Sequence, residues 1–534
     1  MTNTIRQWSI FELPLTSSHN YDNPFQDVWL NTTFVSDQGE VRRIDGFWDG
    51  GDQWKVRFAP PTAGQWRYTT ECSDAFNQGL HGVTGSFVCA SGTGGTRFEQ
   101  HGSVQVDAGK RHFIHTDGTP FFYLADTAWN GPLLSTDDEW KHYLAARVGQ
   151  GFTAVQWVAT QWIAAPDGDI EGRLPFEGHD RVTVNPAVFQ RLDTKVEQIA
   201  QAGLLNVIVL LWGADWGEYE VMKINPGLTL PEEQAARLAR YMVARWGAYP
   251  VIWLLGGDSE YRGARAERWR RIGREVFGGR DHHAPVALHP NGMAWHADEF
   301  RDEAWLSFLG YQGCHFGDDS AFRWAVYGPP ATQWHLEPRR PIINLEPPYE
   351  NHVNISNPSR RLSADEVRRA LYWSLLVSPT AGVSYGGHGV WGWDDGTRPP
   401  TAHAGSGIPL PWREALHMPA AEQLRHLIGL FSGLDWWRLM PDAMLLKAQP
   451  GDQDVHRFVA AARTASGDLA IIYTPKDRRI ALNLSRLAGD VKGEWFNPRT
   501  GERTSAAPHN DEYETPGDGD WLLILRGARE STGN

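Results

Sequence analysis

The sequence has little cysteine and no long hydrophobic run, and each absence excludes a class of protein. Its three cysteines, Cys72, Cys89 and Cys314, cannot all pair, and none lies in a Cys-x-x-Cys pattern. Neither a disulfide scaffold nor a zinc site is therefore indicated, and we expect Cys72 and Cys89 to be free thiols on neighbouring strands. The most apolar segment, residues 204–212, is only strand-sized, whereas a membrane helix needs roughly 18 consecutive apolar residues. We expect no membrane-spanning segment and no membrane partner.

Positive charge and several common catalytic motifs are also scarce. Lys and Arg total 50 against 64 Asp and Glu, a formal net charge of −14, which argues against a nucleic-acid partner. No His-Glu-x-x-His or phosphate-binding Gly-rich motif occurs, which disfavours the proteases and kinases that carry them. His282-His283 lies in a polar loop without further ligands, so we expect no metal and no cofactor. Residues 1–15 have no continuous apolar stretch of the kind found in a secretory signal, and we expect a cytoplasmic protein.

Aromatic residues, in contrast, are abundant. The 534 residues include 26 Trp, 15 Tyr and 22 Phe, beside 55 Gly and 33 Pro. This composition suggests many loops that carry flat aromatic surfaces, on which sugar rings stack, although core packing accounts for part of these residues as well. At roughly 150 residues per domain, the length predicts three or four domains.

Short alternating segments at both ends of the chain predict β domains. Residues 1–98 contain strand-like segments of period two, broken by Gly, Pro and Asp, which is typical of a β-sandwich. A small, polar stretch at 90–96 reads as a linker, and residues 442–526 return to β-like segments. We therefore predict three domains: an N-terminal β-sandwich (1–98), a catalytic domain (99–438) and a small antiparallel β-sandwich (439–534).

The catalytic domain shows apolar runs alternating with amphipathic segments, the pattern of βα units and a parallel sheet. The predicted strands are 121–125, 154–158, 206–211, 251–255, 286–289, 306–311, 341–345 and 382–385. The predicted helices are 136–149, 186–202, 232–246, 262–277, 319–335 and 363–377. Thr136 precedes acidic residues, and Ser363 with Glu366 forms a capping-box pattern. Eight strands over roughly 320 residues predict an α/β fold of the (β/α)8 TIM-barrel type with insertions; a doubly wound sheet is the alternative, but no Gly-x-Gly-x-x-Gly follows the first strand.

Polar and aromatic residues gather at the ends of the predicted strands. In a (β/α)8 barrel the active site lies at the carboxyl ends of the strands, and carboxylates, amides, imidazoles and indoles converging there describe a carbohydrate site. We predict substrate contacts for Asp126, Trp129, Gln156, Trp157, Trp212, His289, Gln312, Glu350, His388 and Trp391. Asp126 is equally placed to cap the following helix, and the tryptophans are equally suited to packing.

Asp258 and Glu346 are the predicted catalytic pair. Each follows an apolar run, so each carboxylate is expected where a buried strand emerges into the site, on strands four and seven at opposite sides of the barrel. Cleavage of a glycosidic bond needs two such groups, one to protonate the leaving oxygen and one to attack the anomeric carbon or activate water. Either acid could instead cap a helix or pair with an arginine, and Glu260 and Glu350 stay open as alternatives.

Several ordered blocks of the sequence resemble one known family. The chain is similar to apiosidase-like glycoside hydrolases, including the β-sandwich that precedes their catalytic domain and the small β-domain after it that is named for collagen binding. The blocks are Gly46-Phe-Trp-Asp-Gly, Trp54-Lys-Val-Arg-Phe-Ala-Pro, the run 113–129, Trp253-Leu-Leu-Gly-Gly-Asp258, Asn344-Leu-Glu-Pro-Pro-Tyr-Glu350 and Trp495-Phe-Asn-Pro-Arg-Thr-Gly501. They recur in the family's order and cover nearly the whole chain.

The resemblance implies a glycoside hydrolase that releases D-apiose from pectic side chains. By similarity to retaining (β/α)8 glycosidases, Asp258 would be the acid/base and Glu346 the nucleophile. The sequence departs from those enzymes in one respect, because Gly257-Asp258 stands where they usually present Asn-Glu. An arabinosidase or another exo-glycosidase on the same scaffold, and a non-catalytic carbohydrate-binding protein, are the alternatives. The expected partner is an oligosaccharide or glycoside and not collagen, and a homo-oligomer stays open.

Overall fold

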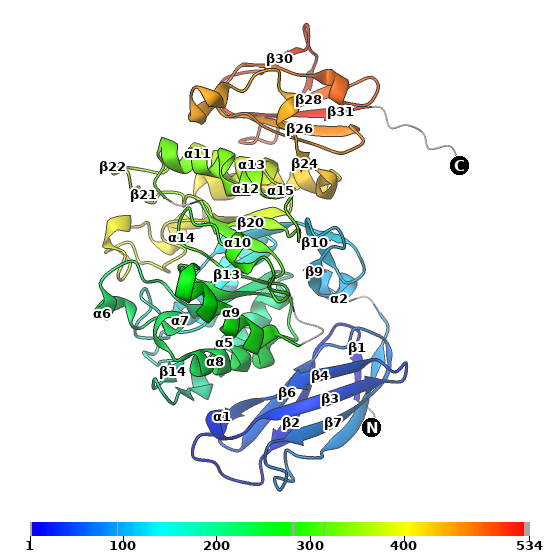
Figure 1. The fold of residues 1–534 in the computed structure, drawn as a ribbon, viewed down its shortest axis with the longest axis vertical. Coiled ribbons are helices and arrows are strands. Elements are labelled where there is room, and N and C mark those ends of the chain that lie inside the picture. Colours follow the sequence, from blue (N-terminus) through cyan, green and yellow to red (C-terminus); the bar gives the residue numbers. More distant parts are fainter. Residues whose placement is uncertain (1–2, 93, 280–283, 314, 528–534) are drawn as a thin grey trace.

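The computed structural model describes residues 3–92, 94–279, 284–313 and 315–527, so the predictions for Cys314 and for His282-His283 fall outside the described residues. Figure 1 shows an elongated molecule with an N-terminal β domain at one end, a C-terminal β domain at the other and the α/β part between them. None of the described helices is long and apolar enough to cross a membrane.

The N-terminal part consists of two sheets with a common core. One sheet contains, in spatial order, β1 (Asn3–Arg6), β8 (Thr84–Ala90), β7 (Gly64–Cys72), β3 (Leu30–Ser36) and β4 (Val41–Asp45). The other contains β2 (Phe11–Thr16), β6 (Gln53–Phe58) and β5 (Phe47–Gly50). Buried and exposed residues alternate along β2, and Phe11 stacks on Phe87 of the other sheet with 4.1 Å between ring centroids. Cys72 and Cys89, on the adjacent strands β7 and β8, are buried free thiols, as predicted.

Parallel strands form the middle of the molecule. Six belong to one curled sheet, in the order β18 (Val286–Ala287), β17 (Val251–Gly257), β16 (Leu205–Trp212), β13 (Ala154–Val158), β12 (Tyr123–Thr127) and β23 (Gly382–Gly386). Two more, β19 (Leu309–Gln312) and β20 (Ile342–Glu346), pair with each other. Each predicted strand overlaps one of these in the predicted order. The strands β13, β16 and β17 are buried on both faces, which is why they read as continuous apolar runs.

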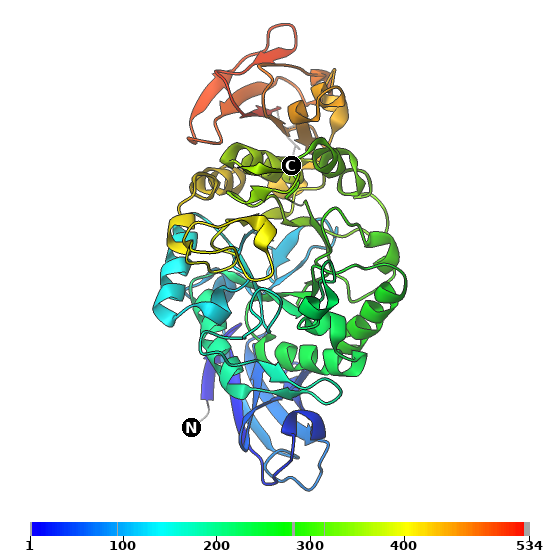
Figure 2. The same ribbon diagram turned by 90° about the vertical axis from the view of Figure 1, so that its left-hand side faces the viewer.

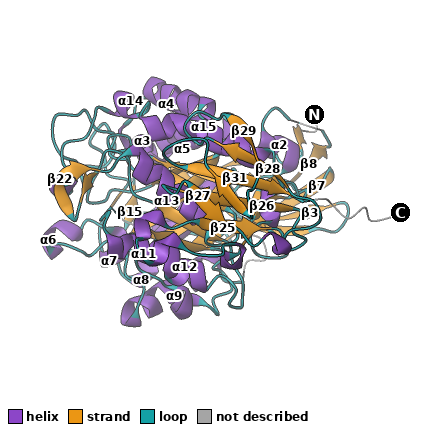
Figure 3. Cartoon of the chain, turned by 90° about the horizontal axis from the view of Figure 1, so that it is seen from above, coloured by secondary structure: helices purple, strands orange, loops and turns teal. Residues whose placement is uncertain are grey.

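Helices follow these strands and lie on either side of them, as the view from above in Figure 3 shows. The helices α4 (Asp137–Gly149), α5 (Pro186–Gln201), α8 (Glu232–Trp246), α9 (Gly263–Phe277) and α13 (Ala364–Leu376) confirm five predicted helices. Capping boxes of Thr136 with Glu139 and of Ser363 with Glu366 begin α4 and α13. The prediction of one helix over 319–335 is wrong, because α11 (Asp319–Tyr327) ends before Gly328 and a short α12 (Pro329–Thr332) follows. Proline at 329 has no N–H to continue the α-helical ladder.

Short elements gather where the parallel strands end. In Figure 1, α6 (Tyr219–Met222), β21 (Val353–Asn354) and β22 (Asn357–Arg361) lie on the same side of the α/β part, and Figure 2 looks onto that side, with helices arranged around the strands. The other short elements of this part are α3 (Gly131–Leu134), β14 (Phe176–Glu177), β15 (Thr183–Val184), α7 (Pro226–Thr229), α10 (Ala297–Phe300), η1 (Ala404–Ser406) and α14 (Trp412–Ala415). A small sheet of β9 (Val104–Val106), β10 (Phe113–His115) and β11 (Pro120–Phe121) precedes β12.

The C-terminal part is an antiparallel sheet packed on the helices of the α/β part. After α15 (Pro419–Ser432) it contains β24 (Met440–Pro441), β25 (Ala460–Arg463), β26 (Leu469–Thr474), β31 (Trp521–Arg526), β28 (Lys492–Phe496) and β29 (Arg503–Ala506), with β27 (Arg479–Ala481) and β30 (Glu512–Glu514) as a separate pair. Ile471 packs in one core with residues of α13 and α15, whereas Ile472 faces the core on the opposite side. A buried ion pair of Arg368 with Asp520, at 2.7 Å, joins α13 to this domain.

Candidate active site

Asp258 occupies a special backbone position directly after β17. Its φ of +48° lies in the left-handed region, which is costly for a residue other than glycine and is found preferentially at functional sites. The side chain is partly exposed, and Oδ2 accepts a hydrogen bond from the indole N–H of Trp216. A Cβ atom at Gly257 would overlap the indole of Trp212. The indole of Trp212 therefore leaves room only for glycine before this acid.

Glu346 is the last residue of β20, and side chains from the neighbouring strand ends surround it. Gln312, at the end of β19, donates to Oε1, and His315 Nε2 lies 3.0 Å from the same oxygen. His289, which follows β18, places Nε2 at 3.5 Å from Oε2. The carboxylate is nearly buried, so these polar contacts hold it in one position.

The two acids have opposite shifts of pKa. Burial and the neighbouring negative charge of Glu346 raise the pKa of Asp258 to about 6. Burial also acts to raise the pKa of Glu346, but hydrogen bonds and positive charge from His289 and His315 outweigh it and hold this pKa below its ordinary value. Below about pH 6 the carboxyl group of Asp258 therefore keeps its proton while that of Glu346 is ionised, as an acid and a nucleophile require.

An aromatic cluster borders the acids. Trp216 is 42% exposed, and its ring lies 5.4 Å from that of His403. His403 belongs to the segment 393–411 after β23 and also contacts Trp391 and Trp162, with 5.1 and 6.0 Å between ring centroids. Trp162 in turn packs on Trp212 at 4.3 Å. Flat rings with polar edges, one of them well exposed beside Asp258, are suited to hold a sugar ring.

Six of the predicted substrate-contacting residues lie in or beside this cluster. His289 and Gln312 contact Glu346 itself. The rings of Trp129 and Trp212 pack on His289 with centroid distances of 5.4 and 6.2 Å, and the indole N–H of Trp129 donates to the Tyr349 hydroxyl. The indole N–H of Trp391 donates to His388 Nδ1.

The other four lie outside this cluster, and their side chains contact other parts of the protein. Gln156 is fully buried between strands, where it contacts Tyr123, Thr127, Ser384 and the backbone of Leu345. Trp157 points to the opposite face of β13 and packs on Trp246 of α8, because successive side chains of a strand alternate between its faces. Asp126 pairs with Arg147 at 2.7 Å and accepts from Tyr143. Glu350 accepts from the Tyr385 hydroxyl and from backbone N–H groups at the start of α15.

The geometry also separates the predicted pair from its rivals. Glu260 is exposed and pairs with Arg265 at 3.1 Å, whereas His289 and His315 contact Glu346. Glu350 is bound to the N-terminus of α15, a favourable place for a carboxylate. In contrast, the negative charge of Glu346 raises the pKa of Asp258, so the two carboxyl groups interact electrostatically.

Four residues of the cluster were not among the predicted site residues: Trp216, His315, Tyr349 and His403. Trp216 and His315 follow predicted strands, and the sequence already places both in the polar and aromatic set at the strand ends. The ring of Tyr349 lies beside that of His315, with 4.5 Å between the centroids, its hydroxyl contacts Glu346, and it follows Glu346 by three residues in the sequence. The fold alone brings in the fourth residue, His403, which is more than fifty residues from Glu346 in sequence and lies on a loop.

Replacing Asp126 by alanine is expected to destabilise the protein strongly. The ion pair of Asp126 with Arg147 is fully buried, and removing one partner of such a pair leaves a buried charge, which costs about 3–5 kcal/mol. Denaturant unfolding would measure the loss. Asp138→Ala is the matched control, because this carboxylate is exposed in the first turn of α4 and should contribute below about 1 kcal/mol. Equal losses in both variants would contradict the structural role of Asp126.

Comparison with known proteins identifies the family of the chain. Residues 107–438 match the model of the apiosidase-like catalytic domain. The chain belongs to this family of glycoside hydrolases. In this apiosidase-like chain, residues 4–73 match a domain of unknown function, DUF5060, and residues 440–526 match a domain described as the collagen-binding domain of a collagenase. No curated protein matches the chain.

Solved structures share the fold of this apiosidase-like protein at low sequence identity. A glycoside hydrolase is 20% identical, with a TM-score of 0.70 over 82% of this chain and 100% of its own. A family 5 glycoside hydrolase from Bacteroides vulgatus is 21% identical, with a TM-score of 0.69 over 83% of this chain and 97% of its own. Another structure from that bacterium, described provisionally as a glycoside hydrolase, is 18% identical, with a TM-score of 0.69, and covers 99% of this chain and 100% of its own.

Proposed function

We propose that this enzyme is a retaining glycosidase with Glu346 as nucleophile and Asp258 as acid/base. The observation that carries the proposal is the different surroundings of the two acids. Gln312, His315 and His289 surround Glu346 and favour its ionised form, whereas Asp258 contacts Trp216 and has its pKa raised to about 6. Asp258 follows β17 and Glu346 ends β20, and both lie on the side where the loops of the parallel strands gather.

We also infer that the parallel strands close into an eight-stranded barrel. The N–H of Ser307, just before β19, donates to the carbonyl of Val286 in β18 at 2.8 Å. On the other side, the N–H of Glu350 after β20 donates to the carbonyl of Gly386 in β23 at 2.9 Å. These links support a continuous ring, with domain boundaries near residues 98 and 438. In such a ring, strands four and seven place their carboxylates on opposite sides of a bound sugar.

The chemistry follows in two steps. An oxygen of Glu346 attacks the anomeric carbon as the bond to the leaving oxygen breaks, and the proton of Asp258 passes to that oxygen. The Asp258 carboxylate then takes a proton from water, whose oxygen attacks the anomeric carbon and releases Glu346. Contacts from Gln312 and His315 hold the nucleophile, and the indole N–H of Trp216 orients Asp258.

The substrate we propose is a glycoside with a terminal apiose or another small furanoside. The family match supports a sugar of this kind. The segment 393–411, which brings His403 against Trp216 and Trp391, supports action at the end of a chain, because it adds a wall beside the acids. An arabinofuranoside is the nearest alternative substrate on the same scaffold.

A turnover screen tests the proposed function. Wild-type protein and the Glu346→Ala variant are assayed in parallel against aryl apiosides, aryl arabinofuranosides, aryl pyranosides and short plant oligosaccharides. Release of one sugar by wild type only, with proton NMR showing that the first anomer formed has the configuration of the substrate, is the expected result. Turnover with the inverted anomer would contradict the retaining mechanism. Sugar binding by wild type without turnover of any substrate would identify a non-catalytic binding protein.

The pH profile should have one limb near neutrality. The pKa of Asp258 is raised to about 6, and its protonated form is the active one, so kcat/KM should fall about tenfold per pH unit above that value. The lowered pKa of Glu346 keeps the nucleophile ionised, so the profile should be flat for several units below. The measurement is kcat/KM for an aryl glycoside between pH 4 and pH 9. A fall in rate from pH 6 toward pH 4 would contradict the proposal that the nucleophile stays ionised in this range.

Trp216→Phe should move that limb to higher pH. The indole N–H donates to Asp258 and lowers its pKa, so losing this donor favours the protonated carboxyl group. The same pH series measures the shift. Trp29→Phe is the matched control, because Trp29 is also exposed but lies on the N-terminal domain, and its profile should equal that of wild type. An unchanged limb in Trp216→Phe would show that this hydrogen bond does not tune the acid.

A further inference from the structure

A large cavity lies away from the acids, between the N-terminal domain and the α/β part. Its volume is about 730 Å³, within the range of sites that hold small molecules. Strands β3, β4 and β5 form one wall, and α8 and α9 form the other. None of its lining residues belongs to the cluster around Asp258 and Glu346.

The two walls of this interdomain cavity are held together by buried polar contacts. Arg245 of α8 pairs with Asp49 at the end of β5 at 2.7 Å, and Arg57 of β6 pairs with Asp193 of α5 at 2.7 Å. The Tyr241 hydroxyl donates to the carbonyl of Trp48 at 3.0 Å. Since these contacts fix the distance between the walls, the cavity is a formed space rather than a loose seam between domains.

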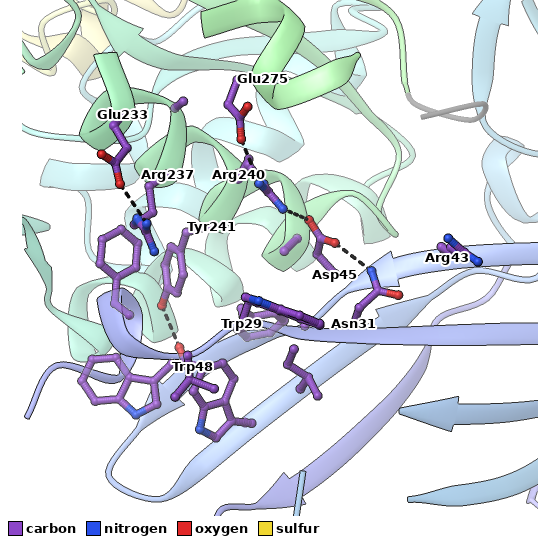
Figure 4. Close-up of a pocket in the computed structure, with 18 of the residues that line it drawn as sticks. Trp29, Asn31, Arg43, Asp45, Trp48, Glu233, Arg237, Arg240, Tyr241 and Glu275 are labelled. Atoms are coloured by element: carbon purple, nitrogen blue, oxygen red, sulfur yellow. Dashed lines mark hydrogen bonds and ion pairs between the residues drawn. The ribbon is translucent and has the colours of Figure 1, made fainter. Parts of the chain in front are cut away.

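The cavity contains one conspicuous aromatic surface. Trp29 is 51% exposed although it stands in the cavity wall, and Figure 4 shows it beside Asn31 and Asp45, below the helix that carries Arg237, Arg240 and Tyr241. A half-exposed indole in a concave site leaves apolar surface in contact with water, which is unfavourable. A ligand with an apolar face would cover that surface.

The polar groups around Trp29 are balanced in charge. Five acidic and four basic side chains line the cavity, and most are joined in ion pairs, such as Arg240 with Asp45 at 3.3 Å and with Glu275 at 3.1 Å. Arg237 pairs with Glu233 at 3.1 Å, and its Nε is buried without a hydrogen-bond partner. A charged ligand would have to break these pairs, whereas hydroxyl groups can donate to the carboxylates and accept from the guanidinium groups that are already in place.

We propose that this cavity is a second, non-catalytic carbohydrate site that binds a neutral sugar ring against Trp29, with its hydroxyl groups facing the ion pairs of Asp45, Arg237 and Arg240. It rests on the proposed function only in that its ligand would belong to the same class as the substrate. The site would hold a part of the glycan, or of a neighbouring glycan, remote from the bond that is cleaved.

Calorimetric titration with defined sugars tests the proposal. The protein carries Glu346→Gln so that no probe is cleaved, and the probes are the neutral arabinotriose, xylotriose and galactotriose and the anionic trigalacturonate. At least one neutral probe should bind at a site whose affinity falls by about tenfold or more in Trp29→Ala and in part recovers in Trp29→Phe, which keeps a flat ring. Phe76→Ala, which removes another exposed aromatic of the same domain, is the matched control and should not change binding.

Two outcomes would overturn the proposal. One is that no neutral probe shows binding that depends on Trp29, and the other is that trigalacturonate is the tightest Trp29-dependent ligand. Hydrolysis by Trp29→Ala with the native Glu346 is assayed separately and should equal that of wild type. The two assays distinguish failure of the catalytic proposal from failure of the second site. If the wild-type protein shows no turnover, the catalytic proposal is refuted. Binding that depends on Trp29 would still establish the second site.

Discussion

The variant Glu346→Ala is expected to lose turnover by at least about 10⁴-fold on every glycoside, because single removals of a nucleophile have effects of that size or larger. Without the carboxylate, none of the side chains that surround it can take over the attack on the anomeric carbon, since Gln312 and His315 serve as its donors and His289 lies 3.5 Å from it. The loss should be the same for good and poor leaving groups. Initial rates with aryl glycosides of graded leaving-group pKa measure it.

Glu260→Ala is the matched control for this variant. Glu260 is exposed and pairs with Arg265, so its removal should leave turnover within about twofold of wild type, as is usual for surface substitutions. Thermal unfolding of Glu346→Ala must resemble that of wild type, so that lost chemistry is not confused with lost fold. Wild-type turnover in Glu346→Ala, or a loss in Glu260→Ala as large as that expected for Glu346→Ala, would refute the assignment.

Much of the fold could be predicted from the sequence because the signals are local. Strands that are buried on both faces, such as β16 and β17, leave continuous apolar runs. Capping boxes at Thr136 and Ser363 mark helix starts in the sequence itself. The break in the predicted helix 319–335 was readable too, because Gly328 and two prolines follow one another, and proline cannot continue a helix.

The candidate site could be predicted only in part, because position at a strand end does not say which way a side chain points. Gln156 and Trp157 are neighbours on β13, yet one lies between the strands and the other packs on α8. Glu350 is four residues from Glu346, but its carboxylate binds the N-terminus of α15, seventy residues away. Contacts of such long range leave no local trace in the sequence.

The same limit applies to the interdomain cavity. Trp29 is one of 26 tryptophans, and nothing in its local sequence separates it from those of the core. Its distinguishing property is its exposure. The packing of β3 and β4 near the helices α8 and α9 leaves the ring of Trp29 half exposed in the cavity wall. In a chain so rich in tryptophan, exposure in a concave site is the property that separates a candidate binding residue from a packing one.

The variant Asp258→Ala is expected to behave differently from Glu346→Ala, and the difference identifies the acid. General acid catalysis contributes about 10²–10⁴-fold, and the loss should approach the upper figure only for glycosides with poor leaving groups. Activated aryl glycosides need no proton from the enzyme, so they should still form the glycosyl-enzyme on Glu346. The variant should then stall, because no base activates water, and a burst of released aryl alcohol should precede slow turnover.

Azide should rescue this variant, since an anionic nucleophile needs no base. It would attack the anomeric carbon, displace Glu346 and give a glycosyl azide of the same configuration as the substrate, which proton NMR detects. The limb of the pH profile near pH 6 should disappear together with Asp258. Because Asp258 holds a left-handed backbone position, Asp258→Asn provides a second test with a residue that tolerates this conformation better than alanine. Loss of activity on activated and unactivated substrates alike, with no effect of azide, would show that Asp258 is not the acid/base.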